Sequence, residues 1–265
     1  MNLIFSNFLN KLAESGLHAA YPLIPENLDN PTDNKIASEL RAICTSHFIR
    51  QRSSKLNALF NLKNSGFNPT VVFDVGAQVG TPELYSAYPD AHHVFIEPVV
   101  ECLPILNEIA AKLLSASVIN CAISNVNGTN LLSVTPSRQY SSIDAKMGDE
   151  SREIDVKTVD AIYEDMDIEG PVLLKIDVDG IEIKVLQGSK SILRKDCVVV
   201  IEASMADENP RFNSVVEFLS SYGYAVYDIV DPLYRQSDWH LWQVDLIFVK
   251  TASPIWGSKT YSQVN

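Results

Sequence analysis

Residues 71–80, which read VVFDVGAQVG, restrict the fold of this chain more than any other stretch of the sequence. An apolar run rich in β-branched residues that continues into an acid and two glycines is typical of a buried parallel strand ending in a tight turn. Thr81, Pro82 and Glu83 then favour a helix start, because threonine can cap it, proline fits its first turn and an acid suits its positive end. The stretch therefore predicts a strand, a glycine turn and a helix N-terminus that face a ligand.

The spacing of the glycines separates two classes of ligand. Asp74, Gly76 and Gly80 form the pattern D-x-G-x-x-x-G, whereas a dinucleotide-binding turn has the pattern G-x-G-x-x-G. An acid at the strand end repels a pyrophosphate but can hold the ammonium of S-adenosylmethionine. On this interpretation a branched side chain at Gly76 would fill the space where the ligand meets the backbone. A glycine turn without a ligand stays an alternative, because short glycine motifs often match by chance.

Acids follow the other expected strands as well. The strand over residues 93–97 ends in Glu97, where folds of this kind bind ribose hydroxyls. The strand in LLKIDVDGIEIKVLQGS (residues 173–189) leads into Asp177, and the strand over residues 198–202 ends in Glu202. Ligands of doubly wound sheets lie beyond the carboxyl ends of the strands, so we expect these acids and Asp74 at one rim of the sheet. Each acid taken alone is equally explained as a helix cap.

The composition limits the kind of partner. A chain of 265 residues fits one large α/β domain, with or without a small appendage. Its net charge of −12 argues against nucleic acid as the main partner, because phosphate binding needs basic patches. No apolar run approaches the roughly 18 residues of a transmembrane helix, so no membrane span is expected. No signal peptide is recognisable and the cysteines lack zinc-site spacing, so a cytoplasmic protein with reduced thiols is the default expectation.

The order of patterns predicts two parts. Residues 1–67 read as an N-terminal helical cap or lid, with a first helical segment that includes residues 3–12 and a second helix over residues 35–63. Residues 68–265 alternate strands with helices, which predicts a parallel sheet covered on both faces. Residues 227–242 show no helical period, so we expect a hairpin and an antiparallel last strand. The polar residues 125–156 predict a β-hairpin insertion.

The elements of the sheet domain can be assigned individually. The expected strands are residues 71–75, 93–97, 117–121, 172–177, 198–202, 225–229 and 244–250, and the expected helices are residues 82–87, 100–113, 158–165, 182–193 and 213–222.

With these residues laid out, the sequence from about residue 69 to residue 250 resembles the FkbM-type family of S-adenosylmethionine-dependent methyltransferases. The resemblance lies in VVFDVGAQVG, the pair Glu97-Pro98, AISNVNG, LLKIDVDGIEIKVLQGS and the closing QVDLIFVK. The block LLKIDVDGIEIKVLQGS is the most specific of these. Two positions depart from the family pattern, since Gln78 stands where asparagine is usual and Asp179 where glutamate is commoner.

The resemblance implies a class I methyltransferase fold, which is Rossmann-like, with a seven-strand, mostly parallel sheet and an antiparallel last strand. It implies S-adenosylmethionine as the cofactor and O-methylation of a hydroxyl on a sugar or secondary metabolite, a small-molecule acceptor. By matching motifs, the cofactor-binding residues would be Asp74, Gly76, Ala77 and Gly80 for the methionine part, Glu97 with Pro98 for the ribose, and Ala122 with Ser124 beside the adenine.

Two acids are the expected catalytic groups. Asp177 is the preferred base or substrate-orienting group, with Asp179 close behind it and Glu202 on the next strand. Two carboxylates close together raise the pKa of one of them, which suits a base near neutrality. The same pair, Asp177 and Glu202, is alternatively a Mg²⁺ site, because Mg²⁺ prefers hard oxygen ligands.

The loop before the last strand carries a second set of candidates. His240 could act as a base at neutral pH, and Tyr234, Trp239 and Trp242 could stack on an acceptor. An ordinary hairpin tip with part-buried aromatic side chains explains the same residues equally well.

Other functions stay open at this point. The same fold could methylate a nitrogen of a small molecule. A nucleotide-binding oxidoreductase would use Glu97 for an NAD ribose, although the acid at Asp74 and the missing third glycine oppose that reading. A non-enzymatic scaffold would need none of the acids to converge.

Overall fold

The computed structural model describes residue 24 and residues 35–41, 54–134, 141–142, 150–205 and 211–257. The chain divides into two compact units, residues 1–54 and residues 55–265. In the first unit residues 35–41 are helical, within the helix predicted over residues 35–63; residues 42–53 and most of the predicted cap lie outside the described residues. Among the described residues, no helix has the length and apolarity needed to cross a membrane.

The second unit begins with α3 (Lys55–Asn64), a helix that the sequence interpretation assigned to the cap. Its buried side chains Ala58, Leu59 and Leu62 pack in one apolar cluster with strand residues of the sheet. The helix therefore forms part of the covering of the sheet, and the proposed division at residue 67 stays a prediction.

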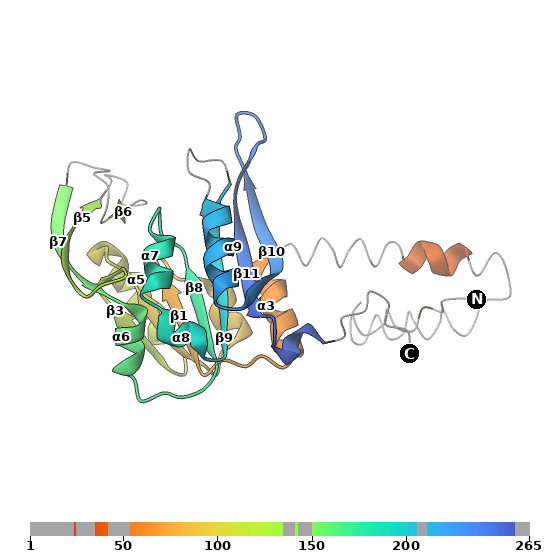
Figure 1. Cartoon of the computed structure of the whole chain (residues 1–265), viewed down its shortest axis with the longest axis horizontal. Coiled ribbons are helices and arrows are strands. Elements are labelled where there is room, and N and C mark those ends of the chain that lie inside the picture. The colour runs from red at the N-terminus through yellow and green to blue at the C-terminus, as the bar shows by residue number, and fades with distance from the viewer. Residues whose placement is uncertain are drawn as a thin grey trace. The chain divides into compact units, whose positions relative to one another are not determined.

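A seven-stranded sheet forms the centre of this unit (Figure 1), in the order β10-β11-β9-β8-β1-β2-β3. Its strands are β1 (Val71–Val75), β2 (His92–Ile96), β3 (Ala116–Ile119), β8 (Val172–Ile176), β9 (Cys197–Ser204), β10 (Tyr224–Tyr234) and β11 (Leu241–Lys250). Strands β3, β2, β1, β8 and β9 are parallel to one another, and β11 runs antiparallel to both β9 and β10. The predicted mostly parallel sheet with an antiparallel last strand is confirmed.

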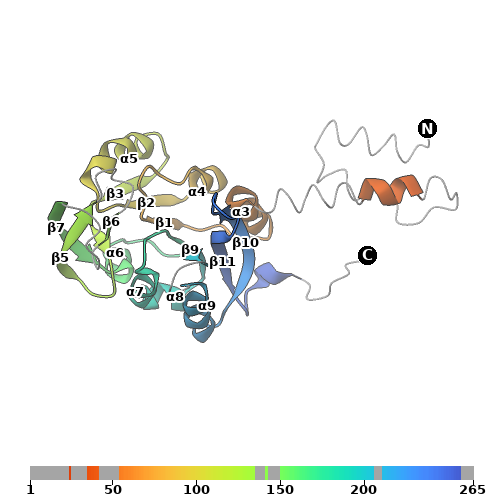
Figure 2. The same cartoon turned by 90° about the horizontal axis from the view of Figure 1, so that it is seen from above.

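Helices cover both faces of the sheet, as Figure 2 shows: α3, α4 and α5 lie on one face and α6 to α9 on the other. The helices after α3 are α4 (Pro82–Ala87), η2 (Val100–Cys102), α5 (Leu103–Ala110), α6 (Val159–Glu164), α7 (Glu182–Gln187), α8 (Lys190–Arg194), α9 (Arg211–Ser221) and η3 (Pro254–Trp256). The single helix expected over residues 182–193 is divided at Gly188. A Cβ at Gly188 would overlap the carbonyl oxygen of Ser124, so the chain comes too close to another backbone there for any larger residue.

The insertion forms a second, four-stranded sheet in the order β4-β7-β5-β6. Its strands are β4 (Ala122–Ile123), β5 (Gly128–Val134), β6 (Ser141–Ser142) and β7 (Glu150–Lys157). The antiparallel pair of β5 and β7 is the predicted hairpin, whereas the parallel pairing of β4 with β7 was not predicted. Arg152 on β7 donates to both carboxylate oxygens of Glu101 at 2.8 and 2.7 Å, which joins the insertion to η2.

Candidate functional site

The glycine turn after β1 is held against the end of β8. The amide of Asp177 donates to the carbonyl of Val75 at 3.0 Å, and a Cβ at Gly76 would overlap the carbonyl oxygen of Asp177. Gly76 has φ +75°, in the left-handed region that favours glycine. Gly76 is therefore required for contact between two protein backbones, and its contact with a ligand stays a prediction.

Hydrogen bonds within the protein already use several amides of this turn. Gly76 and Ala77 both donate to the carbonyl of Ile96, at 3.0 and 3.1 Å, and Gly80 donates to Ala77 at 2.6 Å. The amide of Gln78, whose φ is +45°, donates to Oε2 of Glu97 at 2.8 Å. The conformation of the turn is thus fixed by its hydrogen bonds to β2 and to Glu97.

Glu97 lies directly after β2 and is 4% exposed. Its Oε1 accepts from the amide of Val99 at 2.9 Å, in addition to the Gln78 bond on Oε2. Burial raises the pKa of Glu97, while these two amide bonds act in the opposite direction. Asn120 donates to the carbonyls of Glu97 and Pro98 at 2.8 and 3.1 Å and fixes the pair. Each carboxylate oxygen keeps a lone pair for a further donor.

The two residues expected beside the adenine are both buried. Ala122 starts β4, and Ser124 follows that strand, with exposed fractions of 4% and 6%. The amide of Ser124 donates to the carbonyl of Lys157 at 3.0 Å. Gly188 packs against the Ser124 carbonyl from the other side, so this segment is wedged between β7 and the junction of α7 with α8.

The acids of the expected rim lie on the sheet face that α3 and α4 cover. Successive strand residues alternate between faces, and the apolar residues of this face that pack with α3 include Val72, Leu173, Val200 and Ile247. Asp74, Lys175, Glu202 and Asp245 each lie two residues further toward the site on the same four strands. The register pairs Asp74 with Lys175 and Glu202 with Asp245.

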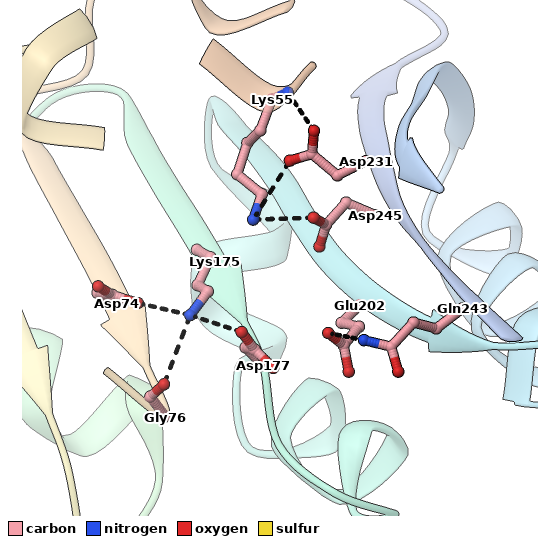
Figure 3. A network of polar contacts seen from close by, with 9 residues as sticks. All are labelled: Lys55, Asp74, Gly76, Lys175, Asp177, Glu202, Asp231, Gln243 and Asp245. Atoms are coloured by element: carbon pink, nitrogen blue, oxygen red, sulfur yellow. Dashed lines mark hydrogen bonds and ion pairs between the residues drawn. The ribbon is translucent and has the colours of Figure 1, made fainter. Parts of the chain in front are cut away.

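Lys175 stands at the centre of this group, as Figure 3 shows. Its ammonium lies 2.9 Å from Oδ1 of Asp74 and 3.1 Å from Oδ2 of Asp177, with the carbonyl oxygen of Gly76 at 3.5 Å. Burial would lower the pKa of Lys175, but the charges of the two carboxylates outweigh it and raise the pKa. Sequence reasoning missed this residue, although a lysine inside the otherwise apolar run VLLKI was a signal.

Asp74 and Asp177, which both pair with Lys175, differ in exposure. Asp74 is 2% exposed, and its Oδ2 has no hydrogen-bond partner. The Asp177 side chain is 40% exposed, so its carboxylate reaches the surface of the site while still paired with Lys175. Of these two acids of the expected rim, Asp74 is therefore buried and Asp177 is accessible to solvent.

Glu202 has a different environment from Asp177. Its Oε2 accepts from Nε2 of Gln243 at 2.6 Å (Figure 3). Burial, followed by the charges of Asp177, Asp245 and Asp179, raises the pKa of Glu202 to about 8, and Lys175 partly offsets these causes. A carboxyl group of this kind exchanges its proton near neutral pH.

The first residue of α3 closes the group from above the sheet. The ammonium of Lys55 lies 2.8 Å from Asp245 and 3.8 Å from Asp231, and the amide of Lys55 donates to Asp231 at 3.2 Å. Asp231 has φ +49° and so leaves the regular course of β10. The start of α3 is thereby fixed to the hairpin of β10 and β11.

The turn after β8 is anchored to α9. Glu182 is 2% exposed, forms an ion pair with Nε of Arg211 at 2.9 Å and accepts a hydrogen bond from the amide of Gly180 at 3.3 Å. Asp179 is exposed on this turn. The anchor fixes the course of the chain that carries Asp177 and Asp179.

The loop between β10 and β11 projects beyond the sheet in Figure 1. His240 is exposed, and its amide and carbonyl bond Asp238 at 3.1 Å and Arg235 at 2.8 Å. Trp239 is 77% exposed, and the Arg235 guanidinium lies 5.8 Å from the Trp242 ring centre. The structure places these residues with Tyr234 at the hairpin tip, and none of their contacts in the described part of the chain reaches Asp177 or Glu202.

The acids do not fit a magnesium site. Among the described residues, no group of three or more histidine, cysteine, aspartate or glutamate side chains is placed to hold a metal ion. Asp177 is paired with the ammonium of Lys175 and Glu202 with the amide of Gln243. A cation beside the expected ligand opposes a second cation, so the predicted alternative of Mg²⁺ at Asp177 and Glu202 is not supported.

A hollow of about 320 Å³ lies at the opposite edge of the sheet. It is lined by Arg194, Lys195, Asp196, Lys250, Ala252, Ser253 and Pro254. None of the predicted site residues belongs to this hollow.

Solved structures with a similar fold are distant. Precorrin-6y C5,15-methyltransferase from Geobacter metallireducens shares 14% identity with a TM-score of 0.43, covering 72% of this chain and 86% of that one. The 1,6-didemethyltoxoflavin-N1-methyltransferase of Burkholderia thailandensis shares 13%, with a TM-score of 0.43 and coverage of 85% and 92%. Fibrillarin from Aeropyrum pernix shares 12%, with a TM-score of 0.43 and coverage of 72% and 74%. These structures are too distant from this chain to indicate its function.

The sequence itself is more informative. No curated protein matches it. A family model described as the methyltransferase FkbM domain matches residues 74–226, which include the glycine turn, Glu97, Asp177 and Glu202. Because this match spans more than half of the chain, the protein belongs to the FkbM methyltransferase family and is an S-adenosylmethionine-dependent methyltransferase.

Proposed function

We propose that this methyltransferase transfers the methyl group to a hydroxyl on a small molecule, a sugar or a secondary metabolite. The single observation that carries the proposal is the pair of acids Asp177, directly after β8, and Glu202, two residues before the end of β9. Asp177 is accessible and paired with a cation, and Glu202 has its pKa raised to about 8. A hydroxyl needs a group to orient it and a base to take its proton, and such a base contributes about 10²- to 10⁴-fold.

The residues of the glycine turn and of β2 suit the cofactor. The methionine part is proposed to lie on the turn of Asp74, Gly76, Ala77 and Gly80, where the negative charge of Asp74 would attract its ammonium. The spare lone pairs of the Glu97 carboxylate are suited to ribose hydroxyls.

Three further residues complete this proposed cofactor site. Pro98 is held with Glu97 through Asn120, and Ala122 and Ser124 follow β3 on the chain and are proposed to border the adenine. Both are buried and small, which favours a flat apolar ring against them.

The chemistry divides between the two acids. S-adenosylmethionine supplies an activated methyl group, so that the acceptor oxygen forms a bond to the methyl carbon while the carbon–sulfur bond breaks and S-adenosylhomocysteine leaves. Glu202 accepts the hydrogen bond of the acceptor hydroxyl and takes its proton, and Asp177 orients the acceptor by accepting a hydrogen bond from a second donor group of the acceptor. Alignment of the reacting groups supplies much of the remaining rate.

The acceptor is proposed to lie between these acids and the hairpin of β10 and β11. Asp179 is exposed on the turn beside Asp177 and is suited to bind acceptor hydroxyls. Tyr234, Trp239 and Trp242 offer apolar surface for a ring, and His240 is the proposed replacement for Asp177 if Asp177 proves dispensable.

A second candidate is methylation of a small-molecule amine by the same site. The observation that favours it is the excess of acids around the site: Asp177, Asp179, Glu202 and Asp245 attract a cationic acceptor. The position of the methyl group in the product distinguishes the two candidates.

Replacing Asp177 with asparagine tests the proposal, because the change keeps the shape and removes the charge. Labelled methyl from S-adenosylmethionine is followed in single turnovers with hydroxylated and amine acceptors, with and without EDTA, at saturating cofactor. We expect Asp177→Asn to slow transfer by about 10²-fold or more and EDTA to have no effect. Asp167→Asn is the control, because Asp167 is exposed on a loop outside the site.

The outcomes separate the possibilities. Full activity of Asp177→Asn would remove Asp177 from the mechanism and shift the proposal to His240. Loss of methyl transfer on addition of EDTA would support a metal ion at Asp177 and Glu202. Failure of the parent protein to bind S-adenosylhomocysteine in a calorimetric titration would overturn the cofactor site itself.

A further inference from the structure

The two acids of the site differ in what holds them. Asp177 has the ammonium of Lys175 at 3.1 Å, whereas Glu202 has the neutral amide of Gln243 at 2.6 Å. Lys175 and Gln243 come from strands on opposite sides of β9. Asp177 thus has a charged partner from β8, whereas Glu202 has a neutral hydrogen-bond donor from β11.

Lys175 is tied to both parts of the proposed site. It is 3% exposed in its side chain and contacts Asp74, which begins the glycine turn, and Asp177, which ends β8. A buried ammonium is stable only when such partners compensate its lost hydration. The geometry therefore fixes three groups relative to one another: the turn proposed for the cofactor, the acid proposed for the acceptor and the cation between them.

We propose that Lys175 is a positioning residue for methyl transfer: its ammonium holds the Asp177 carboxylate at the end of β8 to orient the acceptor, and leaves Glu202 to take the proton. The catalytic meaning of this division rests on the proposed function. The division itself is a property of the protein without cofactor or acceptor, so it can be measured independently.

The charges that face Glu202 come from every neighbouring element. Strand β8 and its turn contribute Lys175, Asp177 and Asp179, and β11 contributes Asp245. Beyond Asp245 lies Lys55 of α3, whose ammonium pairs with both Asp245 and Asp231 of β10. Lys175 is the cation that lowers the pKa of Glu202, and Asp177 is the strongest of the charges that raise it. Removal of either partner of the pair must therefore move the Glu202 titration, and in opposite directions.

Carboxyl-carbon NMR of the whole protein labelled at the glutamate side-chain carboxyl tests this prediction. One glutamate signal is expected to titrate near pH 8 and to be absent in Glu202→Gln, which assigns it. Lys175→Met is expected to raise its midpoint by on the order of one pH unit, because a cation is lost. Asp177→Asn is expected to lower the midpoint by a similar amount, because a like charge is lost.

Lys55→Met is the matched control, since it also removes a buried ammonium but one that pairs with Asp245. In Lys55→Met, the midpoint of the Glu202 titration is expected to move less than in Lys175→Met or in Asp177→Asn. Thermal unfolding of each variant shows whether it is folded. Where Lys175→Met does not fold, Asp177→Asn still decides, because an unchanged midpoint in that variant would show that Asp177 is not held beside Glu202.

Two results would overturn the proposal. The first is the absence of a glutamate that titrates near pH 8 in the parent protein. The second is a midpoint that falls or stays constant in folded Lys175→Met. Binding of S-adenosylhomocysteine is measured on the same samples. Loss of this binding in the parent protein would count against the proposed cofactor site. Unexpected midpoints with normal binding would count against the proposed roles of Lys175, Asp177 and Glu202.

Discussion

Replacing Glu97 with alanine tests the proposed ribose contact most directly. Its carboxylate, 4% exposed, accepts the amides of Gln78 at 2.8 Å and Val99 at 2.9 Å and keeps one lone pair on each oxygen for the ligand. Loss of a carboxylate that accepts two hydroxyl donors costs about 2 to 3 kcal/mol, or about 30- to 150-fold in affinity. The variant also leaves two amides without their acceptor, which costs about 1 to 3 kcal/mol of stability for each amide that stays buried.

Calorimetric titration with S-adenosylhomocysteine measures the affinity, and urea unfolding without ligand measures the stability. The two quantities must be compared, because a distorted Gln78 turn alone would also weaken binding. Glu101→Ala is the control: it removes a carboxylate that pairs with Arg152 rather than one proposed to bind ribose. It is expected to lose stability and to keep its affinity.

A Glu97→Ala protein that binds S-adenosylhomocysteine as tightly as the parent would show that the ribose assignment is wrong. Equal losses of affinity in Glu97→Ala and Glu101→Ala would show that the weakening comes from general destabilisation instead of a lost contact.

Two further predictions concern stability. Gly76→Ala is expected to lower the free energy of unfolding by more than Gly223→Ala does: the φ values are similar, +75° and +80°, but a Cβ overlaps the Asp177 backbone at Gly76 and meets nothing within 4 Å at Gly223. Forcing an extra methyl group into a packed site costs about 1 to 3 kcal/mol, and equal losses in urea unfolding would contradict the overlap. Glu202→Gln is expected to gain stability relative to the parent between pH 5 and pH 9, by up to a few kcal/mol. Folding raises the pKa of Glu202 from about 4.5 to about 8, so the parent loses stability as pH rises through this window and the glutamine variant does not; a constant difference in unfolding free energy across that range would refute the raised pKa.

Much of the fold was predictable because its signals are local. The β-branched runs, the glycine at the turn after β1 and the helical periods act over a few residues, and the predicted strand over residues 71–75 and helix over residues 82–87 agree with β1 and α4. The absence of a helical period between residues 227 and 242 predicted the hairpin and the antiparallel β11, which the register confirms.

The positions of Asp74, Glu97, Asp177 and Glu202 near the carboxyl ends of their strands were also predictable, because these ends share one edge in a parallel sheet, although β9 runs two residues beyond the predicted end at Glu202. The functional roles of these residues stay proposals. The contact of Gly76 with the backbone of Asp177 was not predicted, because no local pattern reveals a contact between distant segments.

The tertiary structure alone decided which acid meets which partner. Pairing of β1 with β8 places Lys175 opposite Asp74, and insertion of β11 beside β9 brings Asp245 and Gln243 to Glu202. These neighbours lie far apart along the chain, and their register follows from the packing of the whole sheet rather than from any single strand. The strength of an acid depends on burial and on charges a few ångströms away. The sequence by itself therefore determined that acids end these strands, whereas the folded sheet decided that Asp177 has a cation beside it and Glu202 does not.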